Sequence, residues 1–257
     1  MNLFNIINSK MYKLISLIIG SIRLILFIIL GFTFCFLFII VSWALSKDVK
    51  PIWGISYRTF LLKFANWALG IRVSRKGEIP IGQCLLVSNH RSYIDATVIL
   101  SENKVYAVSK EEVRKWPIIG YVAGISGTIF IGRFSSIDRK KGLYEIKNAL
   151  IEKKSILNFI QGTTTIGDKL KKTKNGSIVT AYNLGIPIYP ISIDYNDKSN
   201  YWIGKDRFVP HFFRTFGNLT TRVNITYHDR IEGRDINEVV FNVKKTINDG
   251  LETYRLE

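Results

Sequence analysis

An uncharged stretch from Leu24 to Ser46 is the strongest constraint on how this chain can fold. A helix of this length measures about 35 Å, which is enough to cross a hydrocarbon core of roughly 30 Å with some tilt. The preceding residues Leu14 to Ile22 are largely apolar too, and only Arg23 separates them from the longer run. The sequence therefore predicts a membrane anchor over residues 1–50, either a single spanning helix or a helical hairpin broken near Arg23 or Gly31.

A cleaved secretory signal is an alternative interpretation of the same segment. Lys10 and Lys13 precede the apolar run, and Ala44-Leu-Ser46 resembles a small-residue cleavage site. The run is much longer than the hydrophobic region of about 7 to 15 residues in signal peptides, which favours an anchor. A helix buried in a protein core is a further alternative. Basic residues flank the run on both sides, so the positive-inside rule gives no orientation.

Charge and cysteine content limit the classes of partner. The formal net charge is +16, with Lys and Arg distributed over the remainder of the chain. Such a surface attracts anionic lipid headgroups and the phosphates of a cosubstrate. Because no nucleic-acid-binding motif accompanies the charge, we do not expect a nucleic-acid partner. The two cysteines, Cys35 and Cys84, cannot form a disulfide framework or a metal site, and we expect neither a metal nor a resident cofactor.

Short apolar segments alternate with helical patterns beyond residue 50. Strands are expected at residues 72–75, 84–87, 105–108, 128–131, 156–160, 186–193 and 223–227. Helices are expected at residues 55–69, 96–101, 111–116, 136–153, 177–184 and 237–254. This alternation predicts an α/β fold with a largely parallel central sheet flanked by helices. Since no repeat or linker interrupts it, we expect one domain over residues 51–257.

The segment Asn89-His-Arg-Ser-Tyr-Ile-Asp95 follows the strand expected at residues 84–87. It places His90 at the end of a strand and Asp95 about one helical turn later, where the carboxylate can reach back to the imidazole. A neutral histidine accepts a proton near pH 7, and a neighbouring carboxylate fixes its tautomer. We therefore predict that His90 and Asp95 are the catalytic pair.

Three further segments lie at ordered spacings after this pair. They are Gly127-Thr-Ile-Phe-Ile-Gly-Arg133, Phe159-Ile-Gln-Gly-Thr-Thr-Thr165 and Ile186-Pro-Ile-Tyr-Pro-Ile-Ser-Ile193. Together with His90 and Asp95, the set resembles the four motifs of the glycerolipid acyltransferase family, which includes the lysophosphatidic acid acyltransferases. The resemblance covers about residues 55–250. It implies the fold of that family and makes residues 51–257 an acyltransferase domain.

The resemblance also implies a reaction and its substrates. A fatty acyl group would pass from acyl-CoA or acyl-carrier protein, as cosubstrate, to the free hydroxyl of a lysoglycerophospholipid. The leading acceptor is 1-acylglycerol-3-phosphate, which would give phosphatidic acid. The enzyme would act at a cellular membrane, the inner or plasma membrane, with its catalytic domain on the cytoplasmic face and the lipid bilayer as a partner.

Substrate contacts are implied in two of the motifs. By resemblance Arg133 faces the glycerophosphate of the acceptor, since a guanidinium can pair with two phosphate oxygens. The remaining substrate-binding residues implied by the motifs are Gly127, Gln161, Gly162, Thr163 and Thr164.

The third segment departs from the family pattern, which is usually Phe-Pro-Glu-Gly-Thr-Arg. Here Ile160, Gln161 and Thr164 stand in place of Pro, Glu and Arg. The missing arginine removes a phosphate ligand, and threonine at this place resembles relatives that acylate larger-headgroup lysophospholipids or lyso-ornithine lipids. Acylation of such a lysolipid is therefore an alternative, and a non-catalytic lipid-binding relative is another.

Overall fold

The computed structural model describes residues 3–116, 118–132, 135–204 and 206–256. Its strands are β1 (Ile71–Lys76), β2 (Leu85–Ser88), β3 (Tyr106–Lys110), β4 (Thr128–Ile131), β5 (Ile156–Phe159), β6 (Ile188–Tyr195) and β7 (Thr221–Tyr227). Its helices are α1 (Leu3–Ala44), α2 (Val49–Ala68), α3 (Ile94–Glu102), α4 (Glu111–Arg114), α5 (Ile119–Ile125), α6 (Ser136–Ile151), α7 (Gly176–Asn183), α8 (Phe208–Phe216) and α9 (Ile236–Leu256), with a 3-10 turn, η1 (Lys198–Asn200).

The seven strands form one sheet in the order β1-β7-β6-β2-β5-β3-β4. Strands β2 to β6 are parallel, whereas β7 runs antiparallel to β6 and pairs in parallel with β1. The carboxyl ends of β2, β5 and β6 therefore meet at one edge of the sheet. The predicted α/β fold with a largely parallel sheet is confirmed.

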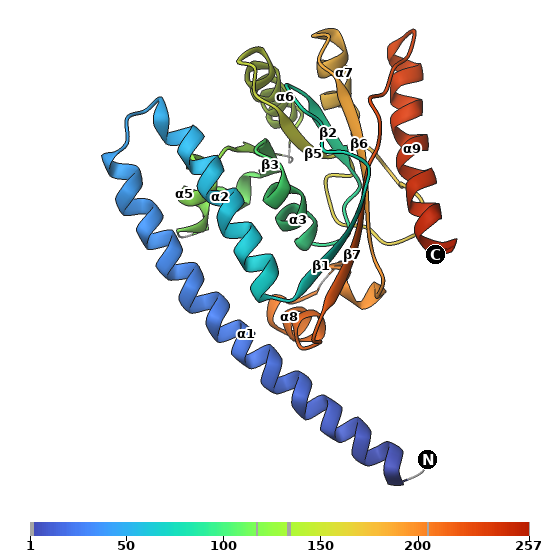
Figure 1. Cartoon of the computed structure of the whole chain (residues 1–257). Coiled ribbons are helices and arrows are strands. Elements are labelled where there is room, and N and C mark those ends of the chain that lie inside the picture. Colours follow the sequence, from blue (N-terminus) through green and yellow to red (C-terminus); the bar gives the residue numbers. More distant parts are fainter. Residues whose placement is uncertain (1–2, 117, 133–134, 205, 257) are drawn as a thin grey trace.

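Helices cover both faces of this sheet (Figure 1). One apolar core lies between the sheet and α3 and α8, with α2 packed beside α3. The other core lies between the opposite face and α6, α7 and α9. Strand β2 lies in the middle of the sheet and is buried along its whole length, which explains why its sequence is almost entirely apolar. The loop that leaves β2 therefore starts from a rigid position.

Two sequence expectations about helices differ from the structure. Helix α1 continues through Arg23 and Gly31, so the predicted break at either residue is wrong. A Cβ at Gly31 would meet nothing within 4 Å, and one glycine costs a helix only about 1 kcal/mol. Helices α5 and α8 were not predicted. Residues 208–216 do place Phe208, Phe212 and Phe216 at helical spacing, but the segment is only nine residues long and has Pro210 in its first turn, where proline is tolerated.

One side of α1 is docked on α8 and the residues that follow it. The Arg23 guanidinium donates hydrogen bonds to the backbone carbonyls of Phe216, Asn218 and Leu219, at 2.9, 2.5 and 2.9 Å. Nearer the N-terminus, the Tyr12 hydroxyl donates to Asn218 Oδ1 at 2.6 Å. Helix C-terminal carbonyls lack intrahelical partners, so a cation is favoured at this place. The interaction fixes the middle of α1 to the domain.

Small residues allow α1 and α8 to approach closely along this contact. A Cβ at Gly20 would stand 2.6 Å from the ring of Phe213, and one at Gly217 would stand 2.4 Å from Ser16 Oγ. A larger side chain at Gly217 would meet backbone atoms of both helices, and one at Gly20 would have to displace the ring of Phe213. The docked side of α1 is therefore specified by size as well as by hydrogen bonding.

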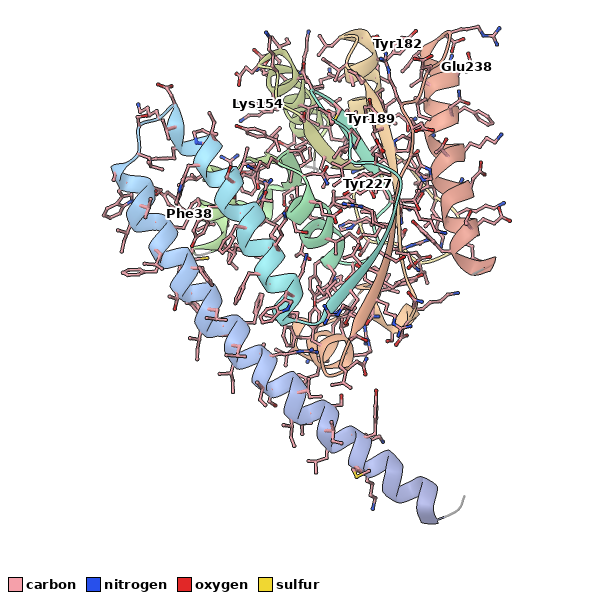
Figure 2. The ribbon with its side chains drawn as sticks, viewed as in Figure 1. Phe38, Lys154, Tyr182, Tyr189, Tyr227 and Glu238 are labelled. Atoms are coloured by element: carbon pink, nitrogen blue, oxygen red, sulfur yellow. The ribbon has the colours of Figure 1, made fainter. Side chains whose placement is uncertain are left out.

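The C-terminal half of α1 packs against α2, which turns back beside it after Ala44 (Figure 1). The ring of Phe38 stacks on Trp53 with centroids 4.8 Å apart, and Figure 2 shows Phe38 on the side of α1 that faces α2. The Tyr57 hydroxyl donates to the carbonyl of Phe34 at 2.8 Å. The two helices thus form a hairpin whose turn, residues 45–48, lies at the end of the apolar run.

The other sides of α1 remain uncovered. Large apolar side chains are exposed along it, including Ile15, Leu17, Ile18, Ile22, Ile25, Leu26, Ile28, Ile29, Phe32, Phe36, Ile40 and Trp43. Among the described residues, α1 is the one helix long and apolar enough to cross a membrane. An exposed apolar surface of this extent is typical of contact with lipid or with another protein.

Arg23→Leu tests the docking of α1. The substitution keeps an apolar stem and removes the donors to the carbonyls of Phe216, Asn218 and Leu219, so we expect a loss of about 1 to 2 kcal/mol, reduced for partial exposure. The melting temperature in detergent should fall by about 3 to 6 °C. Lys13→Leu, at an exposed position of the same helix, is the control and should change it by less than 2 °C. Equal melting temperatures for the two variants would contradict the tether.

Candidate active site

The loop after β2 begins with Asn89, whose side chain continues the sheet. Its Nδ2 donates to the carbonyl of Ile193 at 2.8 Å, and its Oδ1 accepts the N–H of the same residue at 2.9 Å. The backbone pairing of β2 with β6 ends at Ser88 and Ile191. Asn89 is fully buried, and its side-chain amide makes the pair of hydrogen bonds to β6 that the backbone of β2 no longer makes. The backbone can then turn away from the sheet at His90 without leaving β6 unpaired.

His90 and Asp95 meet as the sequence predicts. The distance from His90 Nδ1 to Asp95 Oδ2 is 2.7 Å. The same oxygen accepts the backbone N–H groups of Arg91 at 2.5 Å and Ser92 at 2.9 Å, so Asp95 satisfies the turn that opens α3. Because a carboxylate only accepts, Nδ1 carries the hydrogen and Nε2 is the basic nitrogen. The histidine side chain is 19% exposed and the aspartate is fully buried.

The second oxygen of Asp95 is held from the sheet. The Tyr195 hydroxyl, at the end of β6, donates to Asp95 Oδ1 at 2.5 Å. Burial raises the pKa of the Tyr195 phenol well above its usual range, and the charge of Asp95 raises it further. Tyr195 is therefore a protonated donor at neutral pH. Both oxygens of the carboxylate are thus fixed by donors from separate parts of the chain.

The imidazole of His90 also stacks on an aromatic ring. Phe159, the last residue of β5, lies with its ring centroid 4.1 Å from that of His90 and an interplanar angle of 17°. Since Phe159 is paired with Ser88 in the sheet, its position is set by the strands. The stack and the bond to Asp95 together determine the plane of the imidazole.

The third motif is hydrogen-bonded to the backbone of His90. The N–H of His90 donates to Gln161 Oε1 at 3.1 Å, and Gln161 Nε2 donates to Thr165 Oγ1 at 2.8 Å. The N–H of Thr165 donates back to the carbonyl of His90 at 2.9 Å. Gln161 is 6% exposed, and both ends of its amide have internal partners. In the structure, Gln161 therefore stabilises the loop that carries His90.

The other third-motif residues lie between these two anchors. Gly162 has φ +70°, a conformation that favours glycine, and its N–H donates to the carbonyl of Phe159 at 3.0 Å. Thr163 is exposed and Thr164 is half-buried. Because Gln161 and Thr165 on either side are bonded to the His90 loop, these predicted substrate residues lie close to the histidine.

The two predicted site residues of the second motif, Gly127 and Arg133, lie before and after strand β4 in the sequence. Gly127 precedes β4, at the level where β3 begins, and His90 follows β2 at the opposite edge of the parallel sheet. The two differ by about five positions along the strands, roughly 16 Å at 3.3 Å per residue. The structure does not bring Gly127 to the histidine; a Cβ there would lie 2.9 Å from Ile55, so its small size serves packing against α2. Arg133 lies outside the described residues.

Three supporting residues were quoted in the sequence or lay next to a motif, yet no role was predicted for them. These are Asn89, Phe159 and Tyr195. The two-residue period of β6, with Ile191, Ile193 and Tyr195 in one core, was the available signal for the tyrosine. Nothing local to the sequence indicates that its hydroxyl reaches Asp95, because that contact depends on the order of the strands.

The arrangement suits transfer of a proton to Nε2 of a fixed imidazole. Its orientation is determined by a carboxylate on one side and an aromatic ring on another. In the described part of the chain, no group of three or more His, Cys, Asp or Glu side chains could hold a metal ion. The chemistry that these residues themselves offer is general base catalysis.

Comparison with known proteins gives consistent results. A family model described as "Acyltransferase" matches residues 70–194. A lyso-ornithine lipid O-acyltransferase from Pseudomonas aeruginosa is 30% identical over 174 residues, which is 66% of this chain and 67% of that protein. An enzyme of the same name from Brucella abortus is 28% identical over 59% of this chain and 60% of its own length.

A solved structure shares the fold. It is the crystal structure of a 1-acyl-sn-glycerophosphate acyltransferase from Thermotoga maritima, which superposes with a TM-score of 0.68 and covers 98% of each chain. Its sequence is 20% identical to this one, so the likeness concerns the fold alone. The superposition includes the N-terminal helices as well as the sheet, because it extends over nearly the whole chain.

Asn89→Ala tests the side-chain extension of the sheet. The change removes both hydrogen bonds to Ile193 and leaves a buried N–H and carbonyl unsatisfied, so we expect a loss of about 2 to 4 kcal/mol. Thermal or denaturant unfolding measures it. Asn242→Ala is the matched control, since its single bond to the carbonyl of Glu232 is exposed, and it should cost under about 0.5 kcal/mol. A loss as small at Asn89 would show that the amide is not needed.

Proposed function

The chain belongs to the acyltransferase family, and we propose that it is a membrane-associated O-acyltransferase that transfers a fatty acyl group to the hydroxyl of a lysolipid. The observation that carries this proposal is the 2.7 Å contact of His90 with the buried Asp95. A histidine held in this way can activate an alcohol, which is what O-acylation requires. The names of the relatives supply the class of acceptor.

In the proposed mechanism His90 is the general base. Its Nε2 takes the proton of the acceptor hydroxyl as the oxygen attacks the carbonyl carbon of a thioester. Asp95 holds the Nδ1–H and stabilises the imidazolium that forms. The tetrahedral adduct then collapses, the carbon–sulfur bond breaks, and the imidazolium returns the proton to the leaving thiolate. The acceptor itself is the nucleophile, so no serine of the enzyme becomes acylated.

The proposed donor is a fatty acyl thioester of coenzyme A or of acyl-carrier protein. Both carry phosphates or acidic groups, and the chain has a formal net charge of +16. Long-range attraction of this kind raises the encounter rate more than the final affinity. Neither donor is favoured over the other by the residues around His90.

The acceptor has two candidates within the lysolipid class. The family resemblance predicts 1-acylglycerol-3-phosphate. A lyso-ornithine lipid is the second candidate, and two observations favour it. Thr164 stands where most of the family carries a phosphate-binding arginine, and two relatives are named lyso-ornithine lipid O-acyltransferases. In both cases Arg133 is proposed to face the acceptor.

The proposed place of action is a membrane surface. Exposed apolar side chains cover the outer side of α1, which supports contact with the hydrocarbon region. Because Arg23 fixes the middle of α1 to α8, we propose that the helix lies along the bilayer with the domain rather than crossing it alone. The thioester donors are made in the cytosol, so the proposed face is the cytoplasmic one.

His90→Ala and Asp95→Asn test the mechanism in purified, detergent-solubilised protein given labelled acyl-CoA and a panel of lysolipids. General base catalysis supplies about 10²- to 10⁴-fold, so His90→Ala should lose that much of kcat and Asp95→Asn a large part of it. His228→Ala is the control, because His228 bonds to Ser192 on the face of β6 that packs against α9, opposite the face that carries Tyr195. Activity of His90→Ala within about twofold of the parent would remove His90 from the mechanism.

The panel also tests the lysolipid proposal itself. Transfer to at least one lysolipid is the expected result for the folded parent protein. No transfer to any lysolipid from acyl-CoA or acyl-carrier protein would favour the alternative of a non-catalytic lipid-binding relative.

Thr164→Arg tests the assignment of headgroup preference. Restoring a cation in the loop between Gln161 and Thr165 should add a charge-assisted contact to a phosphate, worth about 1.5 to 3 kcal/mol. The ratio of kcat/KM for 1-acylglycerol-3-phosphate over lyso-ornithine lipid should then rise about 10- to 100-fold. Thr163→Arg, at the exposed neighbour, is the matched control for added charge alone. A ratio that moves equally in both variants would mean that position 164 does not face the headgroup.

A further inference from the structure

Asp95 is bound from two directions. Its Oδ2 accepts three donors that are near in sequence, the ring of His90 and the backbone N–H groups of Arg91 and Ser92. Its Oδ1 accepts one donor that is a hundred residues away, the hydroxyl of Tyr195 at 2.5 Å. This bond joins the first turn of α3 to the carboxyl end of β6.

The local donors alone leave the carboxylate incompletely fixed. All three converge on one oxygen, so the carboxylate could rotate about its Cβ–Cγ bond and present the other oxygen, or tilt while retaining part of the set. A donor on Oδ1 removes this freedom because the two oxygens then have different partners. A buried carboxylate oxygen with no donor would also be costly, so the bond from the sheet is strongly favoured.

We propose that Tyr195 is a positioning residue for the reaction: its hydroxyl holds Asp95 in the orientation that keeps Nδ1–H of His90 bound and Nε2 directed at the acceptor hydroxyl. The inference rests on the proposed function and adds to it a residue outside the four motifs. Tyr195 is 5% exposed and touches the base only through Asp95, so it acts on substrate indirectly. Its position is set by β6, which pairs with β7 as far as Tyr195 and is held on its other side by β2 and the side chain of Asn89 as far as Ile193.

Tyr195→Phe is the direct test, measured as kcat and KM in the detergent-solubilised full chain. The phenyl ring fills the same volume, and only the donor is lost. We expect kcat to fall about 10- to 100-fold while KM for donor and acceptor changes less than about threefold, because the lost contact orients the base and binds neither substrate. A kcat within about twofold of the parent would overturn the proposal.

Tyr227→Phe is the matched control. Tyr227 is also a buried strand tyrosine, 3% exposed, whose hydroxyl donates to a carboxylate, Glu102 Oε2, at 3.1 Å. It lies on β7 in the interior of the fold (Figure 2) and has no contact with the catalytic loop in the part of the chain described. Its variant should lose stability but keep kcat within about twofold. An equal loss of kcat in both variants would mean that Tyr195 contributes general stability only.

A second background keeps the test decisive should Tyr195→Phe fail to fold. In Asp95→Asn the buried charge is absent, so removing the hydroxyl leaves no carboxylate without a donor. If Tyr195 acts through Asp95, the residual kcat of Asp95→Asn and of Asp95→Asn with Tyr195→Phe should agree within about twofold. A further tenfold fall in the double variant would overturn the proposal. Failure of the proposed function is recognised separately, by full activity of His90→Ala.

Discussion

The buried charge of Asp95 is the constraint on which the site depends. An ionised carboxylate without water is tolerated only when donors surround it, and here four donors do so. Two are backbone N–H groups at the start of α3, one is the imidazole and one is the phenol of Tyr195. The loop, the helix and strand β6 must all be in place before the charge is accommodated. Formation of the His90–Asp95 pair therefore depends on closure of this part of the fold.

The order of the strands determines which residues can serve the histidine. Strand β2 lies between β5 and β6, so the loop that carries His90 has one neighbour on each side. From β5 come Phe159, which stacks on the ring, and Gln161, which accepts the backbone N–H. From β6 come the partner of Asn89 and the donor to Asp95. The five parallel strands end at one edge, which brings motifs separated by about a hundred residues into a single site.

Local patterns predicted the seven strands, most of the helices and the contact between His90 and Asp95. The alternation of short apolar runs and helical stripes predicted the parallel sheet. The spacing of His90 and Asp95 spans the turn of residues 91–93, and Asp95, the second residue of α3, reaches back across it to the imidazole. The role of Gln161 could not be predicted, because its partner His90 belongs to a loop that only the strand order brings beside the third motif. Gly127 was assigned to substrate through its motif, yet it precedes the strand whose far end approaches the site. A motif therefore indicates which residues are candidates for a site, but the direction of the strand decides at which edge of the sheet each of them lies.

The same distinction applies to α1, whose composition suggests an independent membrane span. Inserting an arginine at the centre of such a span costs about 2.5 to 3.5 kcal/mol of free energy. A helix without other contacts is therefore expected to break or shift near Arg23. In this chain the guanidinium is satisfied by the carbonyls that α8 leaves unpaired, and the glycines beside it allow the two helices to touch. Ser16, Gly20 and Arg23 of α1 therefore belong to the interface with α8, and the exposed apolar residues of the helix remain for contact with lipid. Because α1 is docked on α8 and on α2, contact of its apolar side with a surface would also determine how the domain, and with it the loop that carries His90, lies relative to that surface.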